Sequence, residues 1–195
     1  MSDTYYVKTF GGLEITNDNV TVNIVELFGK QLVNLLQVLL FHSEKPVQKD
    51  ELIDILWPES KNPSSALKFS IFRLRAELNE IEFFKDKEVI VTTRKGYILN
   101  PNLDWNIDFV ELEKAYNQIN DGSELLDEKE FKTARKIFRL YQGRFYASPS
   151  QLHWILQRQE IFRQMYVKTM MRTSCYLYTQ KRYDEMMLMN YQAVL

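Results

Sequence analysis

The stretch SSALKFSIFRLRAEL, residues 64–78, decides the fold of the first half of this chain. Its apolar residues at positions 67, 71, 74 and 78 recur with the spacing of one helix face, which predicts a helix buried along that stripe. Phe69 and Phe72 lie on the opposite side of the helical wheel, among basic and small residues. Because exposing two phenylalanines does not stabilise a helix, we expect this second face to contact a partner.

Positive charge is concentrated around the same stretch. The whole chain has a net charge of −1, and residues 1–103 carry 12 basic against 14 acidic residues, which counts against a DNA-binding module. Residues 61–75 nevertheless hold four basic residues and no acidic one: Lys61, Lys68, Arg73 and Arg75. Arg94 and Lys95 form a second basic spot. The positive charge is therefore local.

The flanking segments predict a small domain that combines strands and helices. Residues 5–25 are rich in strand formers, and residues 89–99 predict a β-hairpin with the basic tip RKG. Between them, the periodicity predicts helices over 30–43, 49–57 and 64–79. A sheet, three helices and a hairpin is the order of a winged-helix DNA-binding domain. Such a domain places its recognition helix in the major groove and its hairpin near the backbone or minor groove.

The second half predicts a different architecture. Residues 100–108 read as a linker or as the entry to a new domain, and everything after them is helical: 108–119, 127–142, 151–180 and 183–195. The last of these has no cap and no polar closing face, so we expect the domain to be truncated at its C-terminus. The expected fold class is mainly α with a small β component. A winged helix-turn-helix domain over 1–103 is followed by an all-α helical-repeat, tetratricopeptide-like domain over 104–195.

The order of several motifs resembles that of SARP-type bacterial transcriptional regulators. The motifs are VKTFGGLEI, KQLVNLLQVLL, VQKDELIDILWPE, SSALKFSIFRLRAEL, VIVTTRKGYIL and DFVELEKA. Members of this family pair an OmpR/PhoB-type winged helix with a tetratricopeptide-like bacterial transcriptional activation domain, to whose middle helices LYQGRFYASPSQLHWILQRQEIF is similar. The resemblance covers nearly the whole chain, and it implies an activator that binds direct repeats of DNA as tandem copies.

The resemblance also implies DNA contacts for individual residues. The positions that match base- and phosphate-facing residues of the third helix are Ser65, Lys68, Phe69, Ser70, Arg73 and Arg75. Trp57 matches a residue that abuts the backbone, and Thr92 and Arg94 match wing residues at phosphate and minor groove. Ser65 and Phe72 stand where basic residues are common, and Phe69 stands where a small β-branched residue is usual. The base preference should therefore differ from that of the relatives.

The chemistry of these residues suggests roles that agree with the resemblance. Phenylalanines can contact thymine methyls, Arg73 can reach a guanine edge, and Lys68 and Arg75 can hold phosphates. The alternatives are simpler. One phenylalanine would pack under the wing or against the helical domain, the Arg94–Lys95 pair would be a solvated turn, and Trp57 and Thr92 would be ordinary structural residues.

The sequence offers little for catalysis. The two histidines, His42 and His153, lack metal-ligand spacing, and six glycines form no phosphate-binding loop. We therefore expect no enzyme, no metal and no cofactor. The single Cys175, the absence of a signal peptide and a longest apolar run of LLQVLLF predict a cytoplasmic protein with no membrane partner.

The expected function is a sequence-specific DNA-binding transcriptional regulator, an activator, that reads the major groove with helix 64–79 and the backbone or minor groove with hairpin 89–99. Its expected partners are double-stranded DNA, RNA polymerase and another copy of itself on tandem sites. The alternative is a protein–protein interaction module built on a winged helix and helical repeats with weak or lost DNA binding. The acidic balance of residues 1–103 and the two phenylalanines favour that alternative.

Overall fold

The computed structural model describes residues 4–119, 126–147 and 152–192, which fall into two compact units. The first unit is built on Leu13–Asn106, and the second on Ile107–Ala147 and His153–Leu195. Lys8–Gly12 belong to the second unit, although Lys8 is the last residue of the first strand. Among the described helices, none combines the length and the apolar character needed to cross a membrane.

A four-stranded sheet belongs to the first unit, with the strand order β3-β2-β1-β6. The strands are β1 (Thr4–Lys8), β2 (Glu14–Asn17), β3 (Val20–Asn23) and β6 (Asp104–Ile107). The antiparallel pair β2–β3 confirms the predicted N-terminal sheet. Strand β6 was not predicted, since its residues lie in the segment 100–108 that was interpreted as a linker or as the entry to a new domain. The Trp105 ring of this strand packs at a tilt against the rings of Tyr5 and Phe84. These contacts join residues far apart in the sequence, so no local pattern reveals them.

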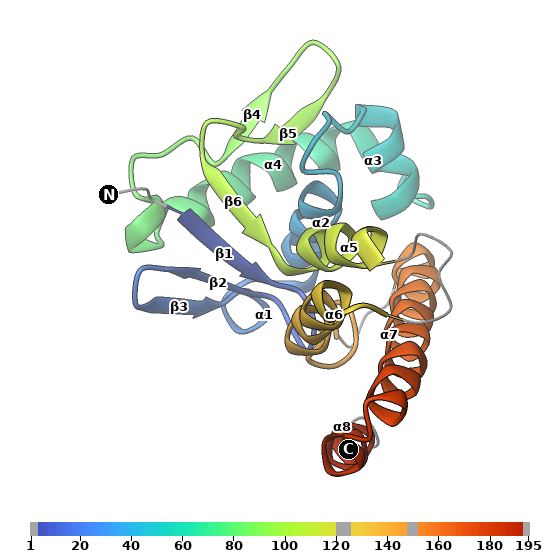
Figure 1. Ribbon diagram of the computed structural model, residues 1–195. Helices are drawn as coiled ribbons and strands as arrows, with labels where there is room; N and C mark the ends of the chain where they lie inside the picture. Colours follow the sequence, from blue (N-terminus) through green and yellow to red (C-terminus); the bar gives the residue numbers. More distant parts are fainter. Residues whose placement is uncertain (1–3, 120–125, 148–151, 193–195) are drawn as a thin grey trace. The chain divides into compact units, whose positions relative to one another are not determined.

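Three helices pack against one another in the first unit, as the periodicity predicted (Figure 1). They are α2 (Lys30–Phe41), α3 (Lys49–Leu56) and α4 (Pro63–Asn79), with the short α1 (Ile24–Leu27) before them and a 3-10 turn, η1 (Glu82–Phe84), after them. Leu67, Ile71, Leu74 and Leu78 are at most 3% exposed, which confirms the core stripe of α4. Because this stripe is buried, the opposite face of α4 is the one exposed to solvent.

The wing is the antiparallel hairpin of β4 (Ile90–Thr92) and β5 (Tyr97–Leu99), as predicted. Val47, between α2 and α3, exchanges two backbone hydrogen bonds with Tyr97, of 2.8 and 3.0 Å. This close approach requires a glycine at position 96, which has a φ of +150°. A Cβ on Gly96 would lie 1.8 Å from the carbonyl oxygen of Val47. The hairpin is thereby held against the connection between two of the helices.

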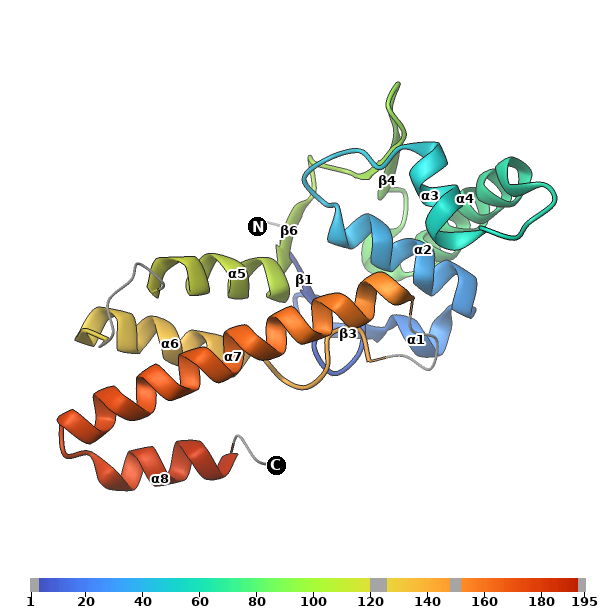
Figure 2. The same cartoon turned by 90° about the vertical axis from the view of Figure 1, so that its right-hand side faces the viewer.

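From Asp108 onward, the described regular elements of the second unit are helices, as the sequence predicted. Its helices are α5 (Asp108–Ile119), α6 (Glu128–Leu140), α7 (His153–Thr179) and α8 (Tyr183–Gln192). Each packs on the next along the chain (Figure 2). Its core contains Phe10, Phe109, Phe145 and Phe162, whose contacting ring centroids lie 4.9 to 6.1 Å apart.

Asp108 explains why Lys8–Gly12 belong to this second unit. Its carboxylate accepts hydrogen bonds from the Thr9 amide at 2.7 Å, the Phe10 amide at 3.1 Å and the Phe109 amide at 2.7 Å, and also from the Thr9 hydroxyl. Burial raises the pKa of Asp108 above its ordinary value, while these hydrogen bonds act in the opposite direction. No local pattern reveals this anchor, because Thr9 and Phe10 lie about a hundred residues away from Asp108 in the chain.

Candidate nucleic-acid interface

The outer face of α4 is open to solvent. Phe69 is 62% exposed and Phe72 is 69% exposed, which confirms that the helix carries an apolar face outside the core. Ser65 and Lys68 are exposed beside them. The buried stripe holds the opposite side of the helix, so the exposed face is presented in a fixed orientation.

Arg73 lies on one flank of this face. Its guanidinium forms an ion pair with Glu77, four residues later, over 3.3 Å, and its side chain remains 52% exposed. Exposed pairs of this kind contribute little to stability. Arg73 can therefore exchange Glu77 for another anion at a small cost.

Arg75 lies on the other flank and has a different environment. Its Nε and Nη2 donate to the Ile90 carbonyl oxygen at 3.1 and 2.8 Å, and Nη2 also donates to the Thr92 hydroxyl at 2.8 Å. Arg75 was predicted to hold a phosphate, but the structure gives its guanidinium these partners in the wing. Thr92 was predicted to contact DNA, and its hydroxyl oxygen accepts one of these bonds. The pair ties α4 to β4.

Arg94 and Lys95 are exposed at the tip of the wing, as the sequence predicted for a basic hairpin. Thr93 orders this turn. Its amide donates to the Gly96 carbonyl at 2.8 Å, and its hydroxyl oxygen accepts from the Lys95 and Gly96 amides at 3.2 Å. Two cations therefore occupy a turn whose backbone is well defined by hydrogen bonds.

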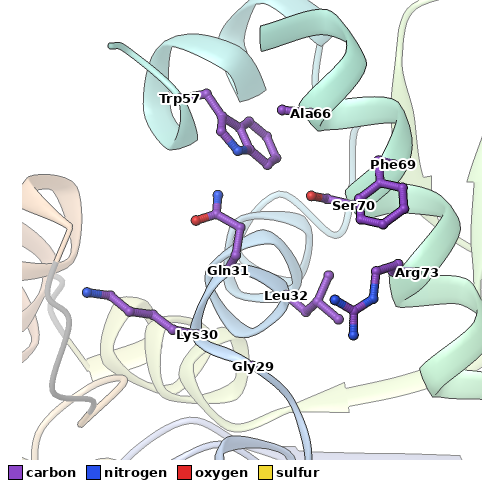
Figure 3. A pocket seen from close by; sticks show the side chains of 9 residues that line it. All are labelled: Gly29, Lys30, Gln31, Leu32, Trp57, Ala66, Phe69, Ser70 and Arg73. Atoms are coloured by element: carbon purple, nitrogen blue, oxygen red, sulfur yellow. The ribbon is translucent and has the colours of Figure 1, made fainter. Parts of the chain in front are cut away.

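A pocket of about 450 Å³ borders α4 on the side of Arg73 (Figure 3). It is lined by Gly29, Lys30, Gln31, Leu32, Trp57, Ala66, Phe69, Ser70 and Arg73. Ser70 is only 8% exposed and Trp57 is half-buried at the end of α3, so both predicted DNA contacts lie on the pocket wall and are less accessible than Lys68.

Sequence reasoning missed the residues that α2 contributes to this pocket. The apolar run after Leu32 suggested a helix that belongs entirely to the core. The polar pair Lys30–Gln31, directly after Gly29, was the available signal that the helix begins at the surface. Within the described ranges, no three His, Cys, Asp or Glu side chains are grouped as a metal site would require.

Comparison with known proteins gives a family-model match over part of the chain. Residues 25–99 match the family model of the C-terminal domain of transcriptional regulatory proteins. The matched stretch includes α4 and the wing. No curated protein matches the chain.

Two solved structures are similar to the chain. EmbR of Mycobacterium tuberculosis, in complex with a low-affinity phosphopeptide, has a TM-score of 0.67 at 17% identity, over 93% of this chain and 47% of EmbR. The chain thus spans about half of the EmbR chain. The DNA-binding domain of Escherichia coli CadC has a TM-score of 0.37 at 25% identity, over 48% of this chain and 87% of that domain. The likeness to EmbR shows a shared fold, a winged helix followed by a helical region.

Proposed function

We propose that this chain is a sequence-specific DNA-binding transcriptional regulator whose helix α4 enters the major groove. The observation that carries the proposal is the division of α4 into a buried stripe and an exposed face with Lys68, Phe69, Phe72 and Arg73. This helix lies in the stretch that matches a domain of transcriptional regulatory proteins. A helix fixed from behind, with cations beside apolar groups on its free face, suits the width and the chemistry of the major groove.

Each exposed side chain has a role in this proposal. Arg73 pairs with a guanine edge, Lys68 binds a phosphate, and the two phenylalanines contact thymine methyls. Ser65 lies in the first turn of α4, where its hydroxyl can donate a hydrogen bond to a phosphate of the DNA backbone. Trp57 borders the same face from the end of α3.

The wing completes the proposed interface. Arg94 and Lys95 bind the phosphate backbone or the minor groove from the hairpin tip. Arg75 and Thr92 act as positioning residues, because the hydrogen bonds of Arg75 to Ile90 and Thr92 hold the wing beside α4. The wing therefore contributes both charge and geometry.

We further propose that the helices of the second unit, from α5 onward, form a tetratricopeptide-like activation domain attached to the DNA-binding first unit. Several large apolar or aromatic side chains of α7 and α8 are more than 45% exposed: Met171, Tyr178, Tyr183, Met187, Leu188 and Tyr191. Such side chains are enriched at protein interfaces. They support contact with RNA polymerase or with a second copy bound to a tandem site.

The test is a selection of duplexes from a random pool by the full chain. We expect enrichment of a defined motif that binds about a thousandfold more tightly than random duplex. Lys68→Ala should reduce the slope of log affinity against log salt by about one unit, whereas Lys132→Ala, exposed on α6, should leave it unchanged. Absence of enrichment, together with absence of binding at low salt, contradicts the proposal.

The second candidate is a protein-interaction module that uses the same face of α4. The exposure of Phe69 and Phe72 and the acidic balance of residues 1–103 favour it. The selection separates the two candidates, because a protein-docking face enriches no duplex. A reduced affinity of Arg73→Ala for the enriched duplex would exclude the second candidate as the sole use of this face.

A further inference from the structure

The pocket beside α4 has no role in the proposed function. Its volume of about 450 Å³ is within the range of sites that bind small molecules, roughly 300–1,000 Å³. Three elements form it: the start of α2, the end of α3 and the flank of α4 that carries Ala66, Ser70 and Arg73 (Figure 3). It lies entirely within the first unit, so its shape is set by the packing of the three helices.

The lining of the pocket combines apolar and aromatic side chains with two basic ones. Leu32, Trp57 and Phe69 supply an aliphatic and two aromatic surfaces, on which a planar group can stack. Lys30 and Arg73 are the two basic residues of the lining, with the Lys30 side chain extending away from the other labelled residues (Figure 3), and none of the nine lining residues is acidic. The chemistry of the pocket is therefore complementary to a ligand with a flat apolar body and a negative charge.

Two further features strengthen this complementarity. Helix α2 begins at Lys30, directly after Gly29, and no acidic residue lies in its first turn, so the partial positive charge of the helix start is not offset there. Arg73 pairs with Glu77 over 3.3 Å at an exposed position, and a ligand anion can replace that carboxylate at a small cost.

We infer that this pocket binds a small aromatic anion, a carboxylate or a phosphate ester, and that the bound ligand competes with DNA. The second part rests on the proposed function, because Phe69 and Arg73 belong both to the pocket and to the proposed DNA-binding face. Arg73 cannot hold the ligand anion and a guanine edge at once. By linkage, the ligand weakens DNA binding by the same factor by which DNA weakens ligand binding.

The test uses the ¹⁵N-labelled 195-residue chain without DNA, titrated with phenyl phosphate and with 3-phenylpropionate. The neutral 3-phenyl-1-propanol is the control for apolar binding alone. We expect saturable amide shifts at residues 29–32 and 66–73 and at the Trp57 indole N–H. Both anions should bind at least about fivefold more tightly than the alcohol, since charge-assisted hydrogen bonds are the stronger ones.

Variants separate the pocket from the remaining surface. Combining Lys30→Gln with Arg73→Gln should weaken binding of the anions about tenfold and leave binding of the alcohol unchanged. Lys49→Gln removes an exposed cation of α3 that does not line the pocket, and it should change nothing. Ala66→Leu should block all three probes by filling the pocket, with thermal unfolding as the check that the domain remains folded.

The site is contradicted by absence of shifts, by shifts that gather on α7 and α8, or by equal binding of the anions to the double variant. Competition is tested separately with the duplex enriched by selection. If phenyl phosphate binds the pocket but leaves the affinity for this duplex unchanged, the inferred competition between ligand and DNA is wrong, and the DNA-binding proposal stands. If no duplex binds while the pocket shifts persist, the proposed function fails and the ligand site stands.

Discussion

Two arginines on α4, only two positions apart, are used in different ways. Arg75 is half-buried and donates three hydrogen bonds to the wing, whereas Arg73 forms one exposed ion pair with Glu77 and lines a pocket. Two positions correspond to a rotation of about 160° around a helix, so the two side chains leave α4 on opposite flanks. On one flank, Arg75 holds the wing against α4. On the other flank, Arg73 is exposed to solvent beside the pocket.

The largest effect is expected from Gly96→Ala, in the wing that Arg75 contacts. The new Cβ would lie 1.8 Å from the Val47 carbonyl oxygen at a φ of +150°, so the hairpin must move away from Val47. We expect a loss of about 3–5 kcal/mol in the free energy of unfolding, measured by urea denaturation. Gly29→Ala is the matched control, because nothing lies within 4 Å of its Cβ position, and it should cost less than about 1 kcal/mol. Equal losses for the two variants would show that the wing is not held by this contact.

Arg75→Ala should have the next largest effect. It removes three hydrogen bonds from a charged donor, and we expect a loss of about 2 kcal/mol in unfolding free energy. Arg75→Lys keeps the charge but not the planar fork that reaches both Ile90 and Thr92, so it should recover only part of this loss. Full recovery by lysine would mean that the positive charge, and not the bracing of the wing, accounts for the contribution of Arg75.

Arg73→Ala, on the other flank of α4, should have a much smaller effect on stability than Arg75→Ala. It removes an exposed pair at helical spacing, and the unfolding free energy should change by less than about 0.5 kcal/mol. The measurement is the same urea titration, run beside Arg75→Ala. If Arg73→Ala destabilised the domain as much as Arg75→Ala does, the proposed division between the two flanks would be wrong.

Glu77→Gln should have the smallest effect, and it concerns binding. The change removes the negative charge 3.3 Å from the Arg73 guanidinium. We expect about twofold tighter binding of the enriched duplex at low salt, with stability changed by no more than a few tenths of a kcal/mol. Glu80→Gln, one turn further along and without this pair, is the control. Equal effects of the two variants would indicate only a change in overall charge.

Much of the fold could be predicted from the sequence because the periodicities are local. The stripe from Leu67 to Leu78, the hairpin over 89–99 and the four helices after residue 107 all follow from patterns within about fifteen residues. Strand β6 and the anchor at Asp108 could not be predicted in this way, since Trp105 packs on Tyr5 and Asp108 binds the backbone of Thr9 and Phe10.

The candidate site shows the same limit. The helical wheel correctly placed Phe69 and Phe72 outside the core, because that requires only the positions within one helix. It could not predict that Arg75 would donate hydrogen bonds to Ile90 and Thr92. Nor could it predict that residues of α2, α3 and α4 would line one pocket. Those contacts depend on how separate elements pack.

The claim that α4 reads bases through Arg73 is tested most directly by a ratio of two affinities, for the enriched duplex and for random duplex. This ratio is measured for the wild type and for Arg73→Ala. If α4 reads bases through Arg73, the variant loses about tenfold or more on the enriched duplex and much less on random duplex, so the ratio falls. Arg75→Lys, which changes the wing brace, should largely keep the ratio. An Arg73→Ala ratio equal to that of the wild type would contradict the claim that this face of α4 reads the sequence of DNA.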